Sequence, residues 1–195
     1  NKAIKLTAND GQSYDRFGYS VSELNSGGML LVGAPYDNEV NGTFDTGSAY
    51  LYTKLEGIWI NSAKVIAHDM EEMDYFGASV TFVTSSIIAV GAPGVDITTD
   101  EVRCVYVMTL TTSKVWEYDS KLSAMDSTRN SHFGNTITAI GENMLLIGAE
   151  GMSAAFIFSK SSSGEGWDQI VQLTGSDTVP GDLFGYSVSG GKEMP

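Results

Sequence analysis

One short phrase occurs four times along this chain of 195 residues. The phrase is Phe-Gly with a small or polar residue and an aliphatic residue after it, and its copies begin at Phe17, Phe76, Phe133 and Phe184. The spacings are 59, 57 and 51 residues. A repeat of this length is one supersecondary unit that cannot bury its own apolar face and must stack on copies of itself. The sequence therefore predicts an array of similar units.

Each of the first three Phe-Gly copies is followed by the same series of short apolar segments. Aliphatic runs that end in a small-residue turn follow at 29–35, 87–93 and 144–150. Alternating segments come next at 48–52, 102–107 and 154–158, and a Trp then precedes another short segment. Branched and aromatic residues split by Gly, Asp, Asn and Ser are typical of β-strands. No window shows a sustained helical period.

Four short strands per unit, repeated radially, favour an all-β fold, a β-propeller of four-stranded antiparallel blades. A two-layer β-sandwich is the alternative. About three and a half blades are expected, with the last two strands of one blade at 4–25 and whole blades at 29–82, 86–140 and 144–189. Propellers need roughly four to eight blades. We therefore expect the remaining blades to come from the same longer chain or from partner chains.

Acidic side chains dominate the charge of this chain. It has 24 Asp and Glu against 11 Lys and Arg, which gives a net charge of -13. Such a surface is a poor partner for nucleic acid and for anionic membrane surfaces. No apolar stretch approaches the ~20 residues of a membrane-spanning helix, so no direct membrane insertion is expected.

The Phe-Gly copies, the Gly-Ala-Pro at 33–35 and 91–93, the acidic loop after it and Gly-Ser-Ala-Tyr-Leu-Tyr at 47–52 together resemble the FG-GAP repeat. That repeat builds the seven-bladed propeller of integrin alpha subunits. The resemblance implies an extracellular or cell-surface setting. It also implies that Phe-Gly lies on the outermost strand of one blade and Gly-Ala-Pro on or just past the innermost strand of the next. The ligand is not implied, because one scaffold hosts unrelated functions.

One loop carries oxygen-bearing side chains at a spacing that suits calcium, a hard cation that takes six to eight oxygens. The expected ligands are Asp37, Glu39, Asn41, Thr43 through its carbonyl, and Asp45. Gly42 permits the sharp bend. The pattern is similar to the Asp-x-Asp-x-Asp-Gly-x-x-Asp loop of integrin-type blades, with two aspartates replaced by Glu and Asn, and both changes should lower affinity. The alternative is an acidic hairpin with Asx-type turns and no metal.

Two further hypotheses concern these loops, a second metal site and a glycosylation site. Asp96 and Asp100 in the next unit form a weaker metal candidate, because that loop lacks the glycine. Asn41-Gly42-Thr43 is also an acceptor sequence for N-glycosylation. A glycan on Asn41 would compete with metal binding through the same amide.

No Ser-His-Asp order, Cys-His pairing or phosphate-binding glycine loop occurs in the sequence. Aspartates recur seven and two residues before the Phe of successive units, as turn capping would produce; the Phe133 copy has Ser131 at the second place. We expect a non-catalytic extracellular or cell-surface binding or adhesion module with a protein or glycan ligand. The alternatives are a non-catalytic propeller appendage of a larger secreted hydrolase and a structural repeat unit of a surface filament.

Overall fold

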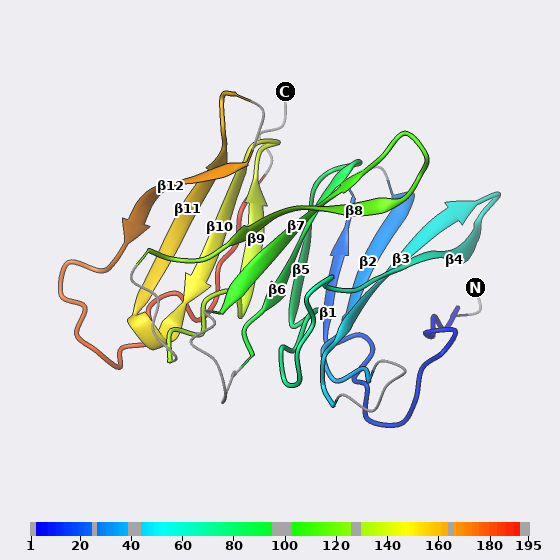
Figure 1. Ribbon diagram of the computed structural model, residues 1–195, viewed down its shortest axis with the longest axis horizontal. Helices are drawn as coiled ribbons and strands as arrows, with labels where there is room; N and C mark the ends of the chain where they lie inside the picture. The colour runs from blue at the N-terminus through cyan, green and yellow to red at the C-terminus, as the bar shows by residue number, and fades with distance from the viewer. Residues whose placement is uncertain are drawn as a thin grey trace.

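The computed structural model describes residues 3–24, 27–38, 44–94, 103–125, 130–163 and 166–191. Within these ranges, the chain forms three separate four-stranded sheets and one short 3-10 helix (Figure 1). None of the helical segments in the described part of the chain is long and apolar enough to cross a membrane.

Every sheet is antiparallel, and its strands are ordered as they occur in the chain. The first sheet contains β1 (Ser20–Glu23), β2 (Met29–Ala34), β3 (Ser48–Leu55) and β4 (Ile58–Val65). The second contains β5 (Ser79–Thr84), β6 (Ile87–Ala92), β7 (Cys104–Leu110) and β8 (Trp116–Leu122). The third contains β9 (Thr136–Ile140), β10 (Met144–Ala149), β11 (Ala154–Lys160) and β12 (Trp167–Leu173), with the 3-10 helix η1 (Glu150–Met152) after β10.

The three sheets are blades of a β-propeller, which confirms the predicted fold class. Strand β5 contacts both β1 and β9, so these three are the innermost strands. Strands β4, β8 and β12 form the opposite edge of each sheet. Figure 1 shows the three blades side by side.

The blades begin one strand earlier than the sequence indicated. Strand β1 pairs with β2 in one sheet, and the Gly18 N–H donates to the Gly33 carbonyl at 3.0 Å. Phe-Gly therefore opens a blade, and the ranges 29–82, 86–140 and 144–189 need correction to sheets at 20–65, 79–122 and 136–173. The segment 4–25 is not half of a separate blade, since β1 belongs to the first sheet.

The physical reason lies in the position of the apolar run. The run that ends in Gly-Ala forms the second strand of each sheet. In the second sheet, which has a blade on either side, this strand is β6, and it is buried at every residue. The innermost strands are short and rich in Ser and Thr, as in β1 and β9. An apolar run therefore indicates a strand that is buried between blades. It does not indicate the strand nearest the propeller axis.

Two of the repeated phenylalanines fill seams between blades. Phe76 is fully buried in a cluster that joins Leu51 and Val65 of the first sheet to Tyr106 of the second. Its ring meets that of Tyr106 edge to face, with 5.5 Å between centroids. Such edge-to-face pairs stabilise by about 0.5–1.5 kcal/mol beyond the area they bury.

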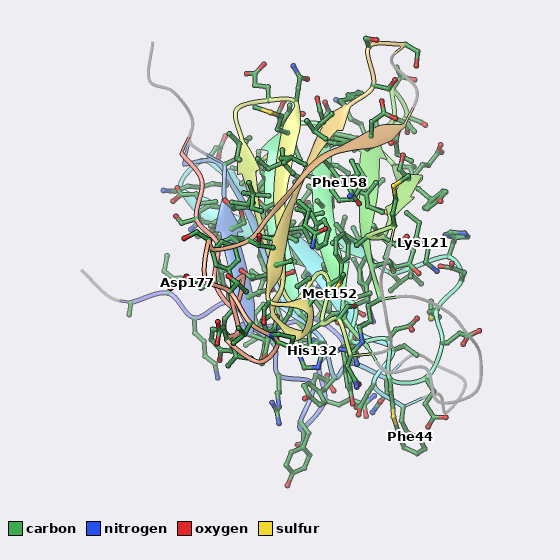
Figure 2. The ribbon with its side chains drawn as sticks, turned by 90° about the vertical axis from the view of Figure 1, so that its left-hand side faces the viewer. Phe44, Lys121, His132, Met152, Phe158 and Asp177 are labelled. Atoms are coloured by element: carbon green, nitrogen blue, oxygen red, sulfur yellow. The ribbon has the colours of Figure 1, made fainter. Side chains whose placement is uncertain are left out.

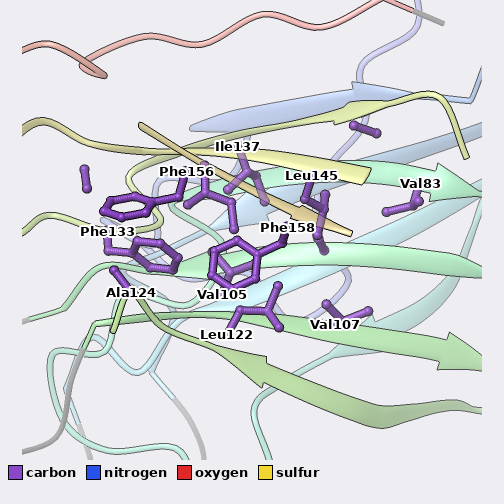
Figure 3. Packing of buried hydrophobic residues seen from close by; sticks show 14 of the residues in the cluster. Val83, Val105, Val107, Leu122, Ala124, Phe133, Ile137, Leu145, Phe156 and Phe158 are labelled. Carbon is purple, nitrogen blue, oxygen red and sulfur yellow. The ribbon is translucent and has the colours of Figure 1, made fainter. Parts of the chain in front are cut away.

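The next seam repeats this arrangement. Phe133 is fully buried and packs with Val105 and Leu122 of the second sheet and Phe156 of the third (Figure 3). The outer copies have a seam on one side only. Phe17 packs on the tyrosines of β3, and Phe184 is 38% exposed.

Pairs of glycines allow the backbones of neighbouring blades to meet. A Cβ on Gly33 would lie 2.0 Å from the Gly77 carbonyl oxygen, and one on Gly91 would lie 2.0 Å from that of Gly134. No side chain fits at such an approach. The Ser20 hydroxyl donates to the Gly77 carbonyl at 2.8 Å and so ties the two blades together.

Candidate functional site

The candidate calcium loop connects β2 to β3, and the structure describes its two ends. Glu39, Asn41 and Thr43 lie outside the described residues, and so do Asp96 and Asp100 of the weaker candidate. Asn41 is also the residue of the glycosylation hypothesis, which therefore concerns a position outside the described residues. In the parts of the chain that are described, no group of three or more His, Cys, Asp and Glu side chains is arranged to hold a metal ion.

Hydrogen bonds close the base of this loop. The Asp45 N–H donates to the Asn38 side-chain oxygen at 2.7 Å, and the Gly47 N–H donates to the Asp37 carbonyl at 3.0 Å. Asp45 adopts a left-handed backbone with φ of 57°. The structure therefore brings together the first and last of the predicted ligands, Asp37 and Asp45, at one hairpin base.

The Asp37 carboxylate is already engaged by neighbouring side chains. Its exposed fraction is only 2%, and its Oδ2 accepts a hydrogen bond from the Tyr50 hydroxyl at 2.7 Å. The same oxygen lies 2.9 Å from the Lys64 ammonium. Burial raises the pKa of the Tyr50 hydroxyl, and its hydrogen bonds to Asp37 and Asp10 raise it further.

Asp10 completes this cluster from the segment that precedes the first blade. The Lys64 ammonium lies 2.8 Å from Asp10 Oδ2, and the Tyr50 hydroxyl lies 2.9 Å from Asp10 Oδ1. Burial alone would raise the pKa of Asp10, but the hydrogen bonds from Lys64 and Tyr50 outweigh it and lower that pKa. Two carboxylates therefore share one ammonium and one hydroxyl.

The described donors fit calcium in part. Carboxylate oxygens are hard ligands, and the closed hairpin base suits a chelating loop. However, Lys64 already places a positive charge against one Asp37 oxygen. A bound cation would be repelled by that ammonium, so the arrangement favours a weak site over a tight one.

The second blade repeats the Tyr–Lys–Asp part of the cluster among its described residues. The Tyr106 hydroxyl donates to Asp69 at 2.8 Å, and the Lys121 ammonium lies 2.9 Å from the same carboxylate. In the third blade, the positions of the Tyr and the Lys are taken by Phe156 and Gln172, which are cross-strand partners. The aspartate seven residues before the Phe thus binds a Tyr–Lys pair in two blades and is not a turn cap there.

The aspartate two residues before the Phe caps a turn in the three copies that have one, as predicted; the Phe133 copy has Ser131 at that place. Asp74 accepts a hydrogen bond from the Glu71 N–H at 2.7 Å, and Asp182 accepts one from the Val179 N–H at 2.8 Å. Asp15 accepts an equivalent bond from Gln12. Burial raises the pKa of Asp74 to about 6, against the opposing effect of its hydrogen bond.

A cavity of about 320 Å³ lies among the segments that follow the Gly-Ala turns and flank the repeated Phe-Gly. All three blades contribute to it, including Tyr36 from the first, Tyr75 from the second, and His132 and Glu150 from the third. Figure 2 shows His132 and Met152 toward the end of the molecule that carries Phe44 of the acidic hairpin. The cavity and the hairpin therefore share one end of the propeller.

The polar part of the cavity contains two buried groups with an unsatisfied atom. Glu150 is 4% exposed, and its Oε1 lies 3.0 Å from His132 Nδ1 and accepts a hydrogen bond from Asn135 Nδ2 at 3.0 Å. Among the described residues, neither Glu150 Oε2 nor Arg103 Nε has a hydrogen-bond partner. Arg103 is 8% exposed, and burial lowers the pKa of its guanidinium while the charge of Glu150 opposes that shift.

Tyrosines form part of the remaining wall of the cavity, together with Pro35, Ala78 and Pro93. The rings of Tyr36 and Tyr75 lie 5.0 Å apart between centroids, at an angle of 44°. The Arg16 guanidinium sits 4.1 Å from the Tyr36 ring centroid, at cation–π distance. Burial is the main cause of a raised pKa for the Tyr75 hydroxyl.

The sequence analysis did not identify these cavity residues. The available signal was their departure from the repeat, because Glu150 stands where the other two copies have Pro35 and Pro93. His132 likewise stands where the preceding copy has Tyr75. Positions that break a repeat are candidates for a function that the repeat does not share.

Comparisons with known proteins bear on the family and not on the ligand. No curated protein sequence matches the chain. Among solved structures, the periplasmic gluconolactonase PpgL of Pseudomonas aeruginosa is similar, with a TM-score of 0.49 and 10% identity. The match covers 76% of this chain and 41% of that one, so this chain spans less than half the length of that protein. The sequence profile of the FG-GAP repeat matches residues 1–52 and 59–108, just over half of the chain. The chain belongs to the FG-GAP repeat family.

Proposed function

We propose that this propeller is a non-catalytic binding module of an extracellular or cell-surface protein. Its ligand, a protein or a glycan, contacts the end of the propeller that carries the cavity and the acidic hairpin. The observation that carries this proposal is the buried pair of unsatisfied atoms, Glu150 Oε2 and Arg103 Nε, in the cavity lining. An unpaired buried polar atom destabilises a fold by about 1–3 kcal/mol. A binding role accounts for its retention.

The use of the recurring carboxylates supports the non-catalytic part of the proposal. Paired carboxylates are the groups that a glycosidase would need. Here Asp10 and Asp69 bind Tyr–Lys pairs, while Asp74 and Asp182 cap turns. These carboxylates serve the same structural purposes in successive blades.

Calcium is proposed as the ion that orders the β2–β3 hairpin, with Asp37, Glu39, Asn41, Thr43 and Asp45 as its ligands. The closed base between Asn38 and Asp45 supports this, as does the run of oxygen donors in the sequence. Calorimetric titration tests it, with Asp45→Ala as the variant. Heat that saturates at millimolar calcium and disappears in the variant is expected. No heat for the unmodified chain removes the metal and leaves the fold untouched.

Further blades, from the same longer chain or from partner chains, are proposed to cover the outward faces of the first and third sheets. At one end, Val21 on the innermost strand β1 is 59% exposed. At the other, Phe184 is 38% exposed although its equivalents Phe76 and Phe133 are fully buried. Both faces therefore present surface that is covered at the internal seams.

The binding role is tested by applying the labelled chain to arrays of immobilised glycans and of extracellular matrix proteins. Binding to at least one class is expected, with loss of the signal in Arg103→Ala. Glu142→Gln, in the turn between β9 and β10 at the opposite end, is the control and should bind normally. Absence of binding on both arrays contradicts the proposal.

A further inference from the structure

We propose that the cavity among the three blades binds one saccharide residue, whose hydroxyl groups hydrogen-bond to Glu150 and Arg103. The inference rests on the proposed binding function and names the ligand class of that site. Three observations carry it: the unsatisfied atoms in the lining, the tyrosines in the wall, and the confinement of the polar groups to positions that break the repeat.

The two unsatisfied atoms need hydrogen-bond partners of opposite kinds. Glu150 Oε2 is an acceptor that needs a donor, and Arg103 Nε carries a hydrogen that needs an acceptor. A hydroxyl group donates and accepts at once, so neighbouring hydroxyls satisfy both residues. An anion would pair with Arg103 but be repelled by Glu150, and a simple cation would meet the reverse problem. The lining therefore favours a neutral polyhydroxylated ligand over either kind of ion.

The Glu150 carboxylate is held in place before any ligand arrives. His132 and Asn135 both contact its Oε1, which leaves Oε2 as the unsatisfied oxygen. The backbone beneath it is fixed as well, because the Gly151 N–H donates to the Ser131 carbonyl at 3.1 Å. A group fixed in this way loses little conformational entropy on binding, which raises affinity.

The apolar part and the size of the cavity fit one sugar ring. Tyr36 and Tyr75 contribute aromatic side chains to the lining, against which the C–H groups of a saccharide can pack. The volume of about 320 Å³ is at the low end of ligand cavities, which span roughly 300–1,000 Å³. A long oligosaccharide would extend beyond it.

The polar groups occur once and are not part of the repeated framework. The equivalents of Glu150 in the other blades are Pro35 and Pro93, which cannot accept or donate through a side chain. The residue before the Phe is His132 in the third blade and Tyr75 in the second. A purely structural requirement of the blade would be expected in each copy, whereas a single ligand needs one set of groups.

Saturation-transfer NMR on the 195-residue chain tests the proposal, with methyl glycosides of glucose, galactose, mannose and N-acetylglucosamine as probes. Millimolar binding of at least one glycoside is expected, and Glu150→Gln should weaken it about tenfold, as the loss of a charged hydrogen bond does. Arg103→Lys keeps the positive charge but lacks the Nε–H, and it should weaken binding similarly. Glu142→Gln is a matched exposed Glu-to-Gln control and should bind as the unmodified chain does.

Two further probes, glycine and inorganic phosphate, distinguish other ligand classes. Binding of either one with no glycoside bound overturns the saccharide assignment. Failure of all four glycosides to bind also overturns it, as does glycoside binding that Glu150→Gln leaves unchanged.

Circular dichroism establishes that each variant is folded. If a variant is unfolded, competition between a bound glycoside and modification of Arg103 by a guanidine-selective reagent provides the second measurement, and absence of protection contradicts the proposal. Array binding that persists in Glu150→Gln would contradict the saccharide site but would agree with the proposed binding function.

Discussion

The ammonium of Lys64 lies 2.9 Å from the carboxylate of Asp37, so the first predicted calcium ligand already has a positive charge beside it. Asp37 is buried, and the Tyr50 hydroxyl binds the same oxygen. The candidate metal loop is therefore joined to the interior of the first blade. Its affinity for a cation depends on residues of β3 and β4 as well as on its own sequence.

Removal of this ammonium should strengthen calcium binding. In Lys64→Met, the bound ion no longer meets the repulsion of the ammonium, and we expect affinity to rise about five- to tenfold, or ~1 kcal/mol. Calorimetry measures the change. Lys121→Met, which removes the equivalent lysine of the second blade, is the matched control and should leave calcium binding unchanged. Equal or weaker binding in Lys64→Met would show that Asp37 is not a ligand.

The glycine contact at the seam should be the most sensitive backbone position tested. In Gly91→Ala, the new Cβ would lie 2.0 Å from the Gly134 carbonyl oxygen, and we expect a loss of more than ~3 kcal/mol in the free energy of unfolding. Gly57→Ala is the control, because its φ is +83° but nothing lies within 4 Å of the added atom. Backbone strain alone should destabilise that variant by about 1–2 kcal/mol. Denaturant unfolding of both variants decides the matter, and equal losses would contradict the close approach.

The Tyr–Lys–Asp cluster should behave as a unit in the second blade. Tyr106→Phe removes the hydroxyl that donates to Asp69 and should destabilise the chain by about 1–2 kcal/mol. The third blade carries Phe and Gln at the two positions. The double variant Tyr106→Phe/Lys121→Gln should therefore destabilise by less than the sum of the single variants. Strict additivity in thermal unfolding would show that the two side chains act independently.

Stability should depend on pH through Asp74. Burial raises the pKa of this carboxyl from 3.8 to about 6 in the folded chain, so the folded state holds the proton more tightly than the unfolded state. The stability that Asp74 contributes is full below pH 3.8 and is lost as pH rises through about 6. Asp74→Asn should flatten this part of the profile and keep the turn cap. Asp182→Asn, at the exposed equivalent turn, is the control. An unchanged slope in Asp74→Asn would contradict the raised pKa.

The sequence predicted the architecture because stacking requires each unit to repeat the same residues at the same places. It misplaced the blade boundaries, because it assigned the apolar run to the innermost strand, whereas that run forms the second strand of each sheet. Met144 to Ile147 illustrates this error, because the run lies on β10 while the shorter β9 takes the axis.

The sites were harder to predict than the fold. Asp37 and Asp45 were identified from local spacing, but the contact of Asp37 with Lys64 joins residues from separate elements. Arg103 and Glu150 meet at the cavity only through the packing of different blades. A local motif finds groups that lie in one loop, and it does not find groups that the tertiary structure brings together.

The pairing of the Phe-Gly segments with the Gly-Ala strands of their own blades tests the central claim most directly. Scalar couplings across hydrogen bonds in the deuterated chain report which N–H donates to which carbonyl. The account predicts couplings from Gly18 to Gly33, Gly77 to Gly91 and Gly134 to Gly148, whose N···O distances are 3.0, 3.0 and 3.1 Å. Couplings from these N–H groups to carbonyls of the preceding blade would contradict it.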